Sequence, residues 1–142
     1  MRALLDVNVL IALLDPDHTL HETAMSWFAK HAGEGWASCP ITQNGCVRIM
    51  SNPNYPNPLA VQAVLKRLAG ACQSDVHEFW PDDVSLLDPR TIDSTRVHGP
   101  RQLTDVYLLT LAVKRQGRFV TFDTAVPLDA VRNATTRHLA IL

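Results

Sequence analysis

The chain lacks any uninterrupted apolar segment close to the roughly 20 residues that a membrane-spanning helix needs. An aspartate and an asparagine interrupt the first apolar run too early for a signal peptide. The formal net charge of −1 gives no overall positive field, so any contact with nucleic acid has to be local. We therefore expect a cytoplasmic protein with no membrane segment.

Cysteine is also scarce. Cys39, Cys46 and Cys72 are odd in number, and their spacing matches neither a zinc site nor a disulfide framework. We expect them to be reduced and to pack as small apolar residues. Among the six histidines only His18 and His21 stand three residues apart, which is weak support for a zinc site.

No repeat, low-complexity tract or linker divides the sequence. Its 142 residues suit one domain with a single well-filled core. A hydrophobic content of 46% with 19% charged residues is typical of a folded globular protein rather than a disordered one. We therefore expect a single domain over residues 1–142.

Short apolar runs alternate with segments of helical periodicity. We expect a turn from strand to helix after residue 6, and a rigid connection at the prolines of residues 51–58. Strands are expected at 2–6, 36–39, 77–80, 119–122 and 139–142, and further helices at 18–32, from 40 onward, at 59–71 and at 103–115. This alternation predicts an α/β fold with a central, mainly parallel sheet of four to five short strands covered by helices on both faces.

Three aspartates stand where an apolar run gives way to a helix or a loop. Asp6 ends the first expected strand, Asp123 ends the fourth, and Asp105 lies in the first turn of the late helix. Ligands of open α/β sheets bind beyond the carboxyl ends of the strands. Three carboxylates brought together there would repel one another unless a cation lay between them, and Mg²⁺ or Mn²⁺ prefers such oxygen ligands.

Each aspartate taken alone also fits a purely structural role. Asp6 could cap the helix behind it, Asp105 could complement a helix dipole, and Asp123 could form an Asx turn. The three positions together favour a metal site.

Four short motifs follow one another along the chain: LLDVNVL (residues 4–10), PITQNGCVRI (40–49), QLTDVYL (102–108) and VTFD (120–123). In these motifs and in their order the chain resembles the PIN-domain nucleases, and within them the VapC-type toxins of bacterial toxin–antitoxin modules. The resemblance extends over essentially the whole chain in length and in the order of elements.

The resemblance implies a metal-dependent endoribonuclease, the toxin of a type II module, which hydrolyses RNA and inhibits translation and growth when it is free of its antitoxin. It also implies a small VapB-type antitoxin as partner and a homodimer. Carried over to this sequence, the metal-binding and catalytic acids would be Asp6, Asp105 and Asp123. Supporting polar roles near them would fall to Asn8, Thr104 and Thr121.

One position departs from the family pattern. The family usually carries a glutamate in the stretch of residues 42–45, and here Gln43 occupies that place as a supporting residue. Its carbonyl can accept from a metal-bound water, but it adds no negative charge and cannot act as a base. A Gln43→Glu substitution would then be expected to tighten metal binding, and Asp129 is a candidate to compensate for the missing acid.

Two arginines are candidates for RNA contacts. Arg101 lies in the loop before the late helix, where it could bring a cation to a phosphate, although a solvated loop is an equally good interpretation. Arg48 could reach the RNA backbone or could pair with a buried acid. The sequence does not choose between these roles.

Two other classes of protein remain open. A haloacid-type phosphatase also uses an aspartate at the end of its first strand, but it needs a second acid two positions on, where this chain has Asn8. A catalytically degenerate PIN-fold module that only binds RNA or a partner would fit the missing glutamate. Binding of Mg²⁺ at millimolar concentration would distinguish the enzyme from such a module.

Overall fold

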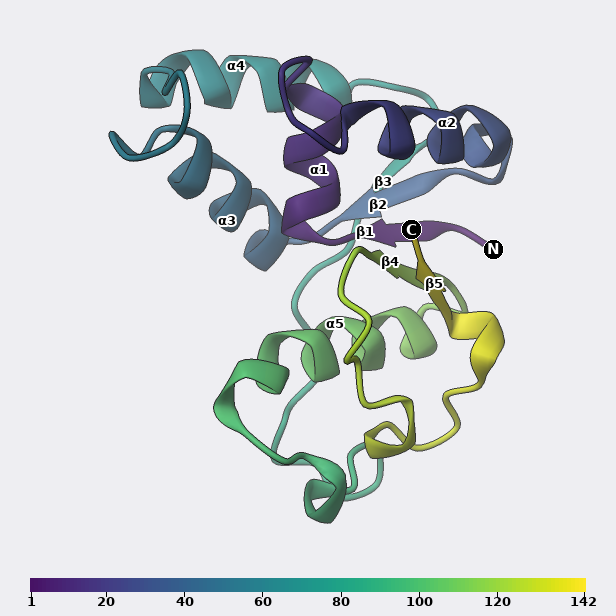
Figure 1. The fold of residues 1–142 in the computed structure, drawn as a ribbon. Helices are drawn as coiled ribbons and strands as arrows, with labels where there is room; N and C mark the ends of the chain where they lie inside the picture. The colour runs from purple at the N-terminus through teal and green to yellow at the C-terminus, as the bar shows by residue number, and fades with distance from the viewer.

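The computed structural model describes residues 1–142. Five parallel strands form one sheet in the order β3-β2-β1-β4-β5 (Figure 1). The strands are β1 (Ala3–Leu5), β2 (Trp36–Ser38), β3 (His77–Phe79), β4 (Arg118–Thr121) and β5 (Leu139–Ile141). The predicted α/β class is confirmed, and the sheet is parallel throughout rather than only mainly so.

Helices cover both faces of this sheet. Four lie on one side and the fifth on the other, as Figure 1 shows. The first group comprises α1 (Val7–Leu14), α2 (His21–His31), α3 (Pro40–Met50) and α4 (Val61–Cys72), and the opposite face carries α5 (Leu103–Lys114). The expected strands and helices are all present, with ends that differ by a few residues at most. The final turn of α2 runs into a 3-10 segment at Ala32–Glu34.

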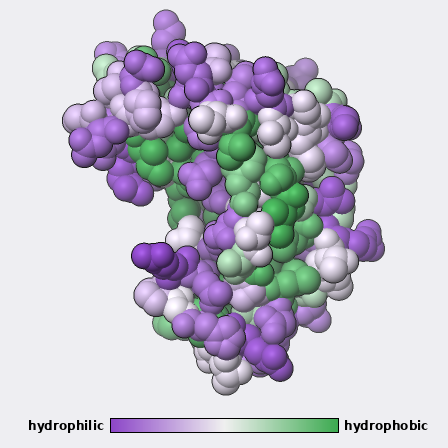
Figure 2. Space-filling view, in the orientation of Figure 1, coloured by the Kyte–Doolittle hydropathy of each residue, from purple (hydrophilic) through white to green (hydrophobic).

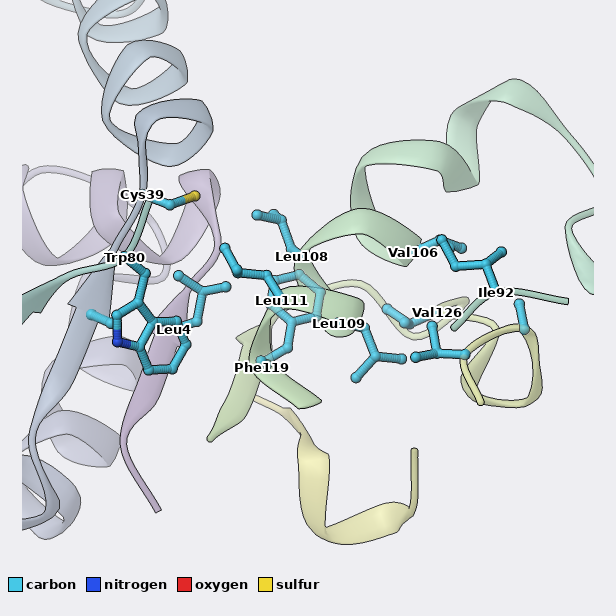
Figure 3. Close-up of a cluster of buried hydrophobic side chains, with 14 residues drawn as sticks. Leu4, Cys39, Trp80, Ile92, Val106, Leu108, Leu109, Leu111, Phe119 and Val126 are labelled. Carbon is cyan, nitrogen blue, oxygen red and sulfur yellow. The ribbon is translucent and has the colours of Figure 1, made fainter. Parts of the chain in front are cut away.

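The apolar run of β1 is buried on both faces because successive side chains of a strand point in opposite directions. Leu4 packs into one cluster with Phe119 and the helix α5, which Figure 3 shows in close-up. Leu5 packs on the other face with Trp36 and residues of α1, α3 and α4. Because both faces of β1 are buried, its sequence is apolar throughout and does not alternate between apolar and polar residues.

The start of α3 is fixed by local chemistry. Pro40 occupies the first turn, where its missing N–H costs nothing. The Thr42 hydroxyl accepts from the Cys39 N–H at 3.0 Å and donates to the Cys39 carbonyl at 3.1 Å. Further along, Gly45 allows α3 to approach α1 closely, since a Cβ at that position would lie 2.8 Å from Cγ2 of Val7.

The cysteines are free, as expected: Cys39 and Cys46 are buried, and Cys72 is half-buried. Every helix is too short or too polar to cross a membrane.

Candidate active site

The carboxyl ends of the parallel strands meet at one edge of the sheet, where α1, α3 and α5 also begin (Figure 1). Asp6 directly follows β1, and Asp123 comes two residues after β4, the neighbouring strand. Asp105 lies in the first turn of α5. Figure 2 shows the surface indented on this side of the molecule, with both hydrophilic and hydrophobic residues along the hollow.

Asp6 is the most firmly held of the three. It is only 8% exposed and caps α1, with its Oδ1 accepting from the Val7 N–H at 2.7 Å. Its Oδ2 accepts from the Thr121 hydroxyl at 2.7 Å. Burial raises the pKa of Asp6, the charge of Asp123 adds to that increase, and the hydrogen bonds from Thr121 and Val7 oppose it.

Thr121 links Asp6 to Asp123. Its hydroxyl donates to Asp6 and accepts from the Asp123 N–H at 3.1 Å. The Asp123 carboxylate is exposed and accepts from the Ala125 N–H at 2.7 Å, which is the Asx turn considered above. Asp6 therefore does cap α1, and Asp123 does form an Asx turn. These hydrogen bonds keep both carboxylates at the edge of the sheet, so the structural roles are compatible with a metal site there.

Asp105 faces the other two acids from α5. Its pKa is raised to about 7, mainly because the carboxyl is partly buried, and further because Asp6 is a nearby negative charge and Asp123 is both a charge and a hydrogen-bonding neighbour. The structure thus brings the three predicted aspartates into electrostatic contact, although they are separated by up to 117 positions in the sequence.

A metal ion is implied by the family resemblance, so we asked whether this cluster suits one. As the side chains stand, no group of three or more histidine, cysteine, aspartate or glutamate residues is arranged to hold a metal ion. The chemistry of the donor set nevertheless fits Mg²⁺ or Mn²⁺, because it consists of carboxylates, and the charges of Asp6 and Asp123 add to the effect of burial in raising the pKa of Asp105.

The other predicted site residues lie at different distances from this cluster. Asn8 and Thr104 are exposed in the first turns of α1 and α5, and neither makes a side-chain hydrogen bond. Arg101 is exposed in the 3-10 turn Pro100–Gln102 that leads into α5. Arg48 is exposed on α3 and lines a groove between α3 and α4, so it does not pair with a buried acid.

Asp129 cannot replace a missing acid in the cluster as placed, because its carboxylate pairs with Arg96 at 3.2 Å on the surface. Gln43 does not hydrogen-bond any of the three aspartates. Its side-chain amide donates instead to the hydroxyl of Ser38 at 2.9 Å.

Ser38 and its partner His77 were not identified from the sequence. The Ser38 hydroxyl lies 2.8 Å from Nε2 of His77, across the boundary between β2 and β3. The available signal was the position of Ser38 as a polar residue at the end of a buried strand, the same signal that identified Asp6.

No family model matches the chain. The curated proteins to which it is similar include three ribonucleases of Mycobacterium tuberculosis. It is 56% identical to "Ribonuclease VapC44" over 142 residues, which is the full length of both chains. It is 44% identical to "Ribonuclease VapC39" over 127 residues, covering 89% of this chain and 91% of that protein. It is 42% identical to "Ribonuclease VapC38" over 125 residues, covering 87% and 86%.

Identities of this size over nearly complete chains confirm the family that the four sequence motifs resemble, and the parallel α/β sheet agrees with it. The chain therefore belongs to the VapC family of PIN-domain ribonuclease toxins.

Proposed function

We propose that this protein is an endoribonuclease toxin of a type II toxin–antitoxin module and that its activity depends on Mg²⁺ or Mn²⁺. The observation that carries the proposal is the convergence of Asp6, Asp105 and Asp123 at the carboxyl edge of the sheet, with Asp105 raised to a pKa of about 7. The relatives named as ribonucleases support RNA as the substrate.

Asp6, Asp105 and Asp123 would hold the ion. When bound, Mg²⁺ or Mn²⁺ supplies a water of lowered pKa and neutralises charge on the phosphate being cleaved. The protein contributes orientation: Thr121 and the Val7 N–H fix both oxygens of Asp6, so this carboxylate presents a constant geometry. Asn8 and Thr104, exposed in the adjoining helix turns, would orient water or RNA.

Arg101 is the better placed of the two candidate RNA contacts, because its 3-10 turn leads directly into the helix that carries Asp105. It makes no ion pair within the chain and so is free to meet a phosphate. Arg48 would contact RNA further along, from the groove beside α4.

The remaining features of the proposal follow from the family. They are a VapB-type antitoxin as partner, inhibition of translation and growth when the antitoxin is absent, a homodimer, a cytoplasmic location and a single domain over residues 1–142. Exposed apolar side chains on α4, Val61 and Leu65, are compatible with a protein partner.

The test is cleavage of structured and unstructured RNA by the purified, antitoxin-free protein with Mn²⁺, Mg²⁺ or EDTA. We expect cleavage that needs the metal and that is lost in Asp105→Asn. Asp129→Asn is a matched control, because it removes the same charge from the surface pair with Arg96 and should leave cleavage unchanged. Full cleavage by Asp105→Asn would contradict the site assignment.

A catalytically degenerate binding module is the second candidate, favoured by the engagement of Gln43 with Ser38 and by the open arrangement of the three acids. Such a module should neither cleave RNA nor bind Mg²⁺ at millimolar concentration in calorimetry. The haloacid-type phosphatase is disfavoured by Asn8, which occupies the place of the required second acid and is exposed on α1.

A further inference from the structure

Ser38 is the centre of a partly buried hydrogen-bond network on the side of the sheet away from α5. The residue is fully buried at the end of β2. Its hydroxyl lies 2.9 Å from the Gln43 amide nitrogen, 2.8 Å from Nε2 of His77 and 3.9 Å from the sulfur of Cys72. The network therefore joins the first turn of α3 to both β2 and β3.

The direction of these hydrogen bonds follows from the donors that are present. The Cys72 backbone near His77 raises the pKa of the ring, as a carbonyl does when it accepts from a ring N–H. In the neutral tautomer that carries its proton on Nδ1 and directs it to this carbonyl, Nε2 can only accept. The Ser38 hydroxyl accepts from the Gln43 amide, and in this tautomer it donates to Nε2 of His77.

We propose that Gln43 is a positioning residue that completes this directed chain, from Gln43 to Ser38 to His77, and not a group that faces the metal. The proposal rests on the proposed function only in assigning a role to the position at which the family usually carries glutamate. A side-chain amide suits this position because the Ser38 hydroxyl has one proton, which it gives to His77, and so takes a donor as its other partner.

The location of the network supports the same assignment. Ser38 shares a face of the sheet with Trp36, whose cluster includes Leu5 and residues of α3 and α4. Thr121, which holds Asp6, shares the opposite face with Phe119 and α5. Gln43 and the Thr121–Asp6 pair thus lie on different faces.

The network bears on the active site through the packing of α3. Two residues beyond Gln43, the glycine Gly45 is in close approach to Val7, whose N–H holds Asp6. The hydrogen bond from Gln43 anchors the first turn of α3 to Ser38. This anchor therefore keeps the contact between α1 and α3 in place, and with it Val7, the residue next to Asp6.

The surroundings of His77 favour its neutral form. Burial lowers the pKa of His77, the Arg2 guanidinium lowers it further, and the Cys72 backbone and the Glu78 carboxylate act in the opposite direction. Arg2 is also paired with Glu78 at 3.2 Å, which weakens the influence of that acid. Trp36 covers the ring from the neighbouring strand, with centroids 4.4 Å apart.

A glutamate at position 43 would reverse the chain. A carboxylate has no proton to donate, so the Ser38 hydroxyl would donate to it, and Nε2 of His77 would need a proton of its own. The His77 ring would then carry a proton on both nitrogens, as an imidazolium. It would donate to the Ser38 hydroxyl, which would donate to the new carboxylate, and we call this arrangement the relay. Gln43→Glu should therefore change the charge of His77, rather than tighten metal binding as the sequence alone suggested.

The experiment uses the full chain labelled with ¹⁵N-histidine, whose long-range ¹H–¹⁵N spectra distinguish the two neutral tautomers and the imidazolium. We expect wild-type His77 at pH 7 to be neutral with its proton on Nδ1. Gln43→Glu should lower the acid dissociation constant of His77 by about tenfold or more. Asn44→Asp is the matched control, because it adds the same charge to an exposed neighbour in the same turn and should leave His77 unchanged.

The double variant Ser38→Ala with Gln43→Glu breaks the relay, and it should return His77 toward its wild-type protonation. Wild-type His77 with its proton on Nε2, or equal shifts in Gln43→Glu and Asn44→Asp, would overturn the proposal. These spectra need neither RNA nor metal, so they succeed or fail independently of nuclease activity.

Calorimetry with Mn²⁺ gives a second, separate readout. Gln43→Glu should change the affinity by less than about twofold, whereas altering groups around a metal site usually changes it by about tenfold or more. A tenfold tighter binding that Asn44→Asp does not reproduce would place position 43 at the metal and would refute the proposal.

Discussion

Replacing Asp105 with asparagine should make the metal-free protein more stable. The pKa of this carboxyl is about 7 instead of its ordinary 3.8, which corresponds to at most roughly 4 kcal/mol of unfavourable free energy when the group is ionised. Asp105 is only partly buried, so solvent screening reduces this cost. The substitution also removes a favourable interaction between the Asp105 charge and the N-terminus of α5, which reduces the stabilisation by about 0.3–1 kcal/mol. We expect a net stabilisation of about 1–2 kcal/mol.

The stabilisation should depend on pH with a definite sign. Because the folded-state pKa of Asp105 lies above the unfolded value, the folded protein binds the extra proton between about pH 4 and 7. Stability of the wild-type protein in EDTA should therefore fall as the pH rises through this range, and the fall should be smaller in Asp105→Asn. Urea unfolding at pH 5 and pH 8, in EDTA, measures both variants.

Asp129→Asn controls for the loss of one negative charge and should change stability by less than about 0.5 kcal/mol at either pH, because Asp129 forms only an exposed ion pair. If Asp105→Asn were less stable than wild type in EDTA at pH 8, burial and the neighbouring acids would not disfavour the ionised Asp105 carboxyl as we infer. An equal gain at pH 5 and pH 8 would show that the unfavourable ionisation of Asp105 is not the source of the stabilisation.

Two further substitutions test the framework of the site. Thr121→Val should cost about 1–3 kcal/mol at pH 7 by removing the hydroxyl that donates to the buried Asp6 carboxylate, as measured by urea unfolding. Thr124→Val, at an exposed position, is its control, and equal losses in the two would count against the role of Thr121. Gly45→Ala should cost about 1–3 kcal/mol because its Cβ would press on Val7, whereas Gly70→Ala, with open space around it in α4, should be neutral or gain about 0.5–1 kcal/mol. A thermal melt that found both glycine variants equally stable would contradict the close α1–α3 contact.

Much of the fold could be predicted because its strands are buried on both faces. The run around Leu4 and Leu5 shows no polar alternation, which is typical of a central parallel strand. Helix ends were less accurate where no strong signal existed: α3 begins at Pro40 as expected, whereas α2 begins at His21 rather than at residue 18. Residues before His21 form turns held by local hydrogen bonds, which periodicity does not detect.

The site could be predicted only in part. Position at a strand end identified Asp6 and Asp123, because parallel topology forces carboxyl ends to one edge. Residue type alone did not show where the Gln43 side chain is directed, since an amide can serve a metal-bound water or a serine equally well. Its engagement with Ser38 depends on His77, a residue 34 positions further along, and such long-range pairing has no signature in a single sequence.

The three acids differ in how firmly the protein holds them, and this difference bears on how a cation would engage them. Asp6 is fixed through both oxygens, by Val7 and Thr121. Asp123 is exposed and held through one oxygen by its Asx turn, and Asp105 accepts no hydrogen bond from the backbone. Rotation of the Asp105 and Asp123 side chains toward a fixed Asp6 would convert the present cluster, in which no three side chains are arranged to hold an ion, into a set of oxygen ligands. The adjustment on metal binding should therefore be confined to these two side chains, while the sheet edge and Asp6 remain as they are.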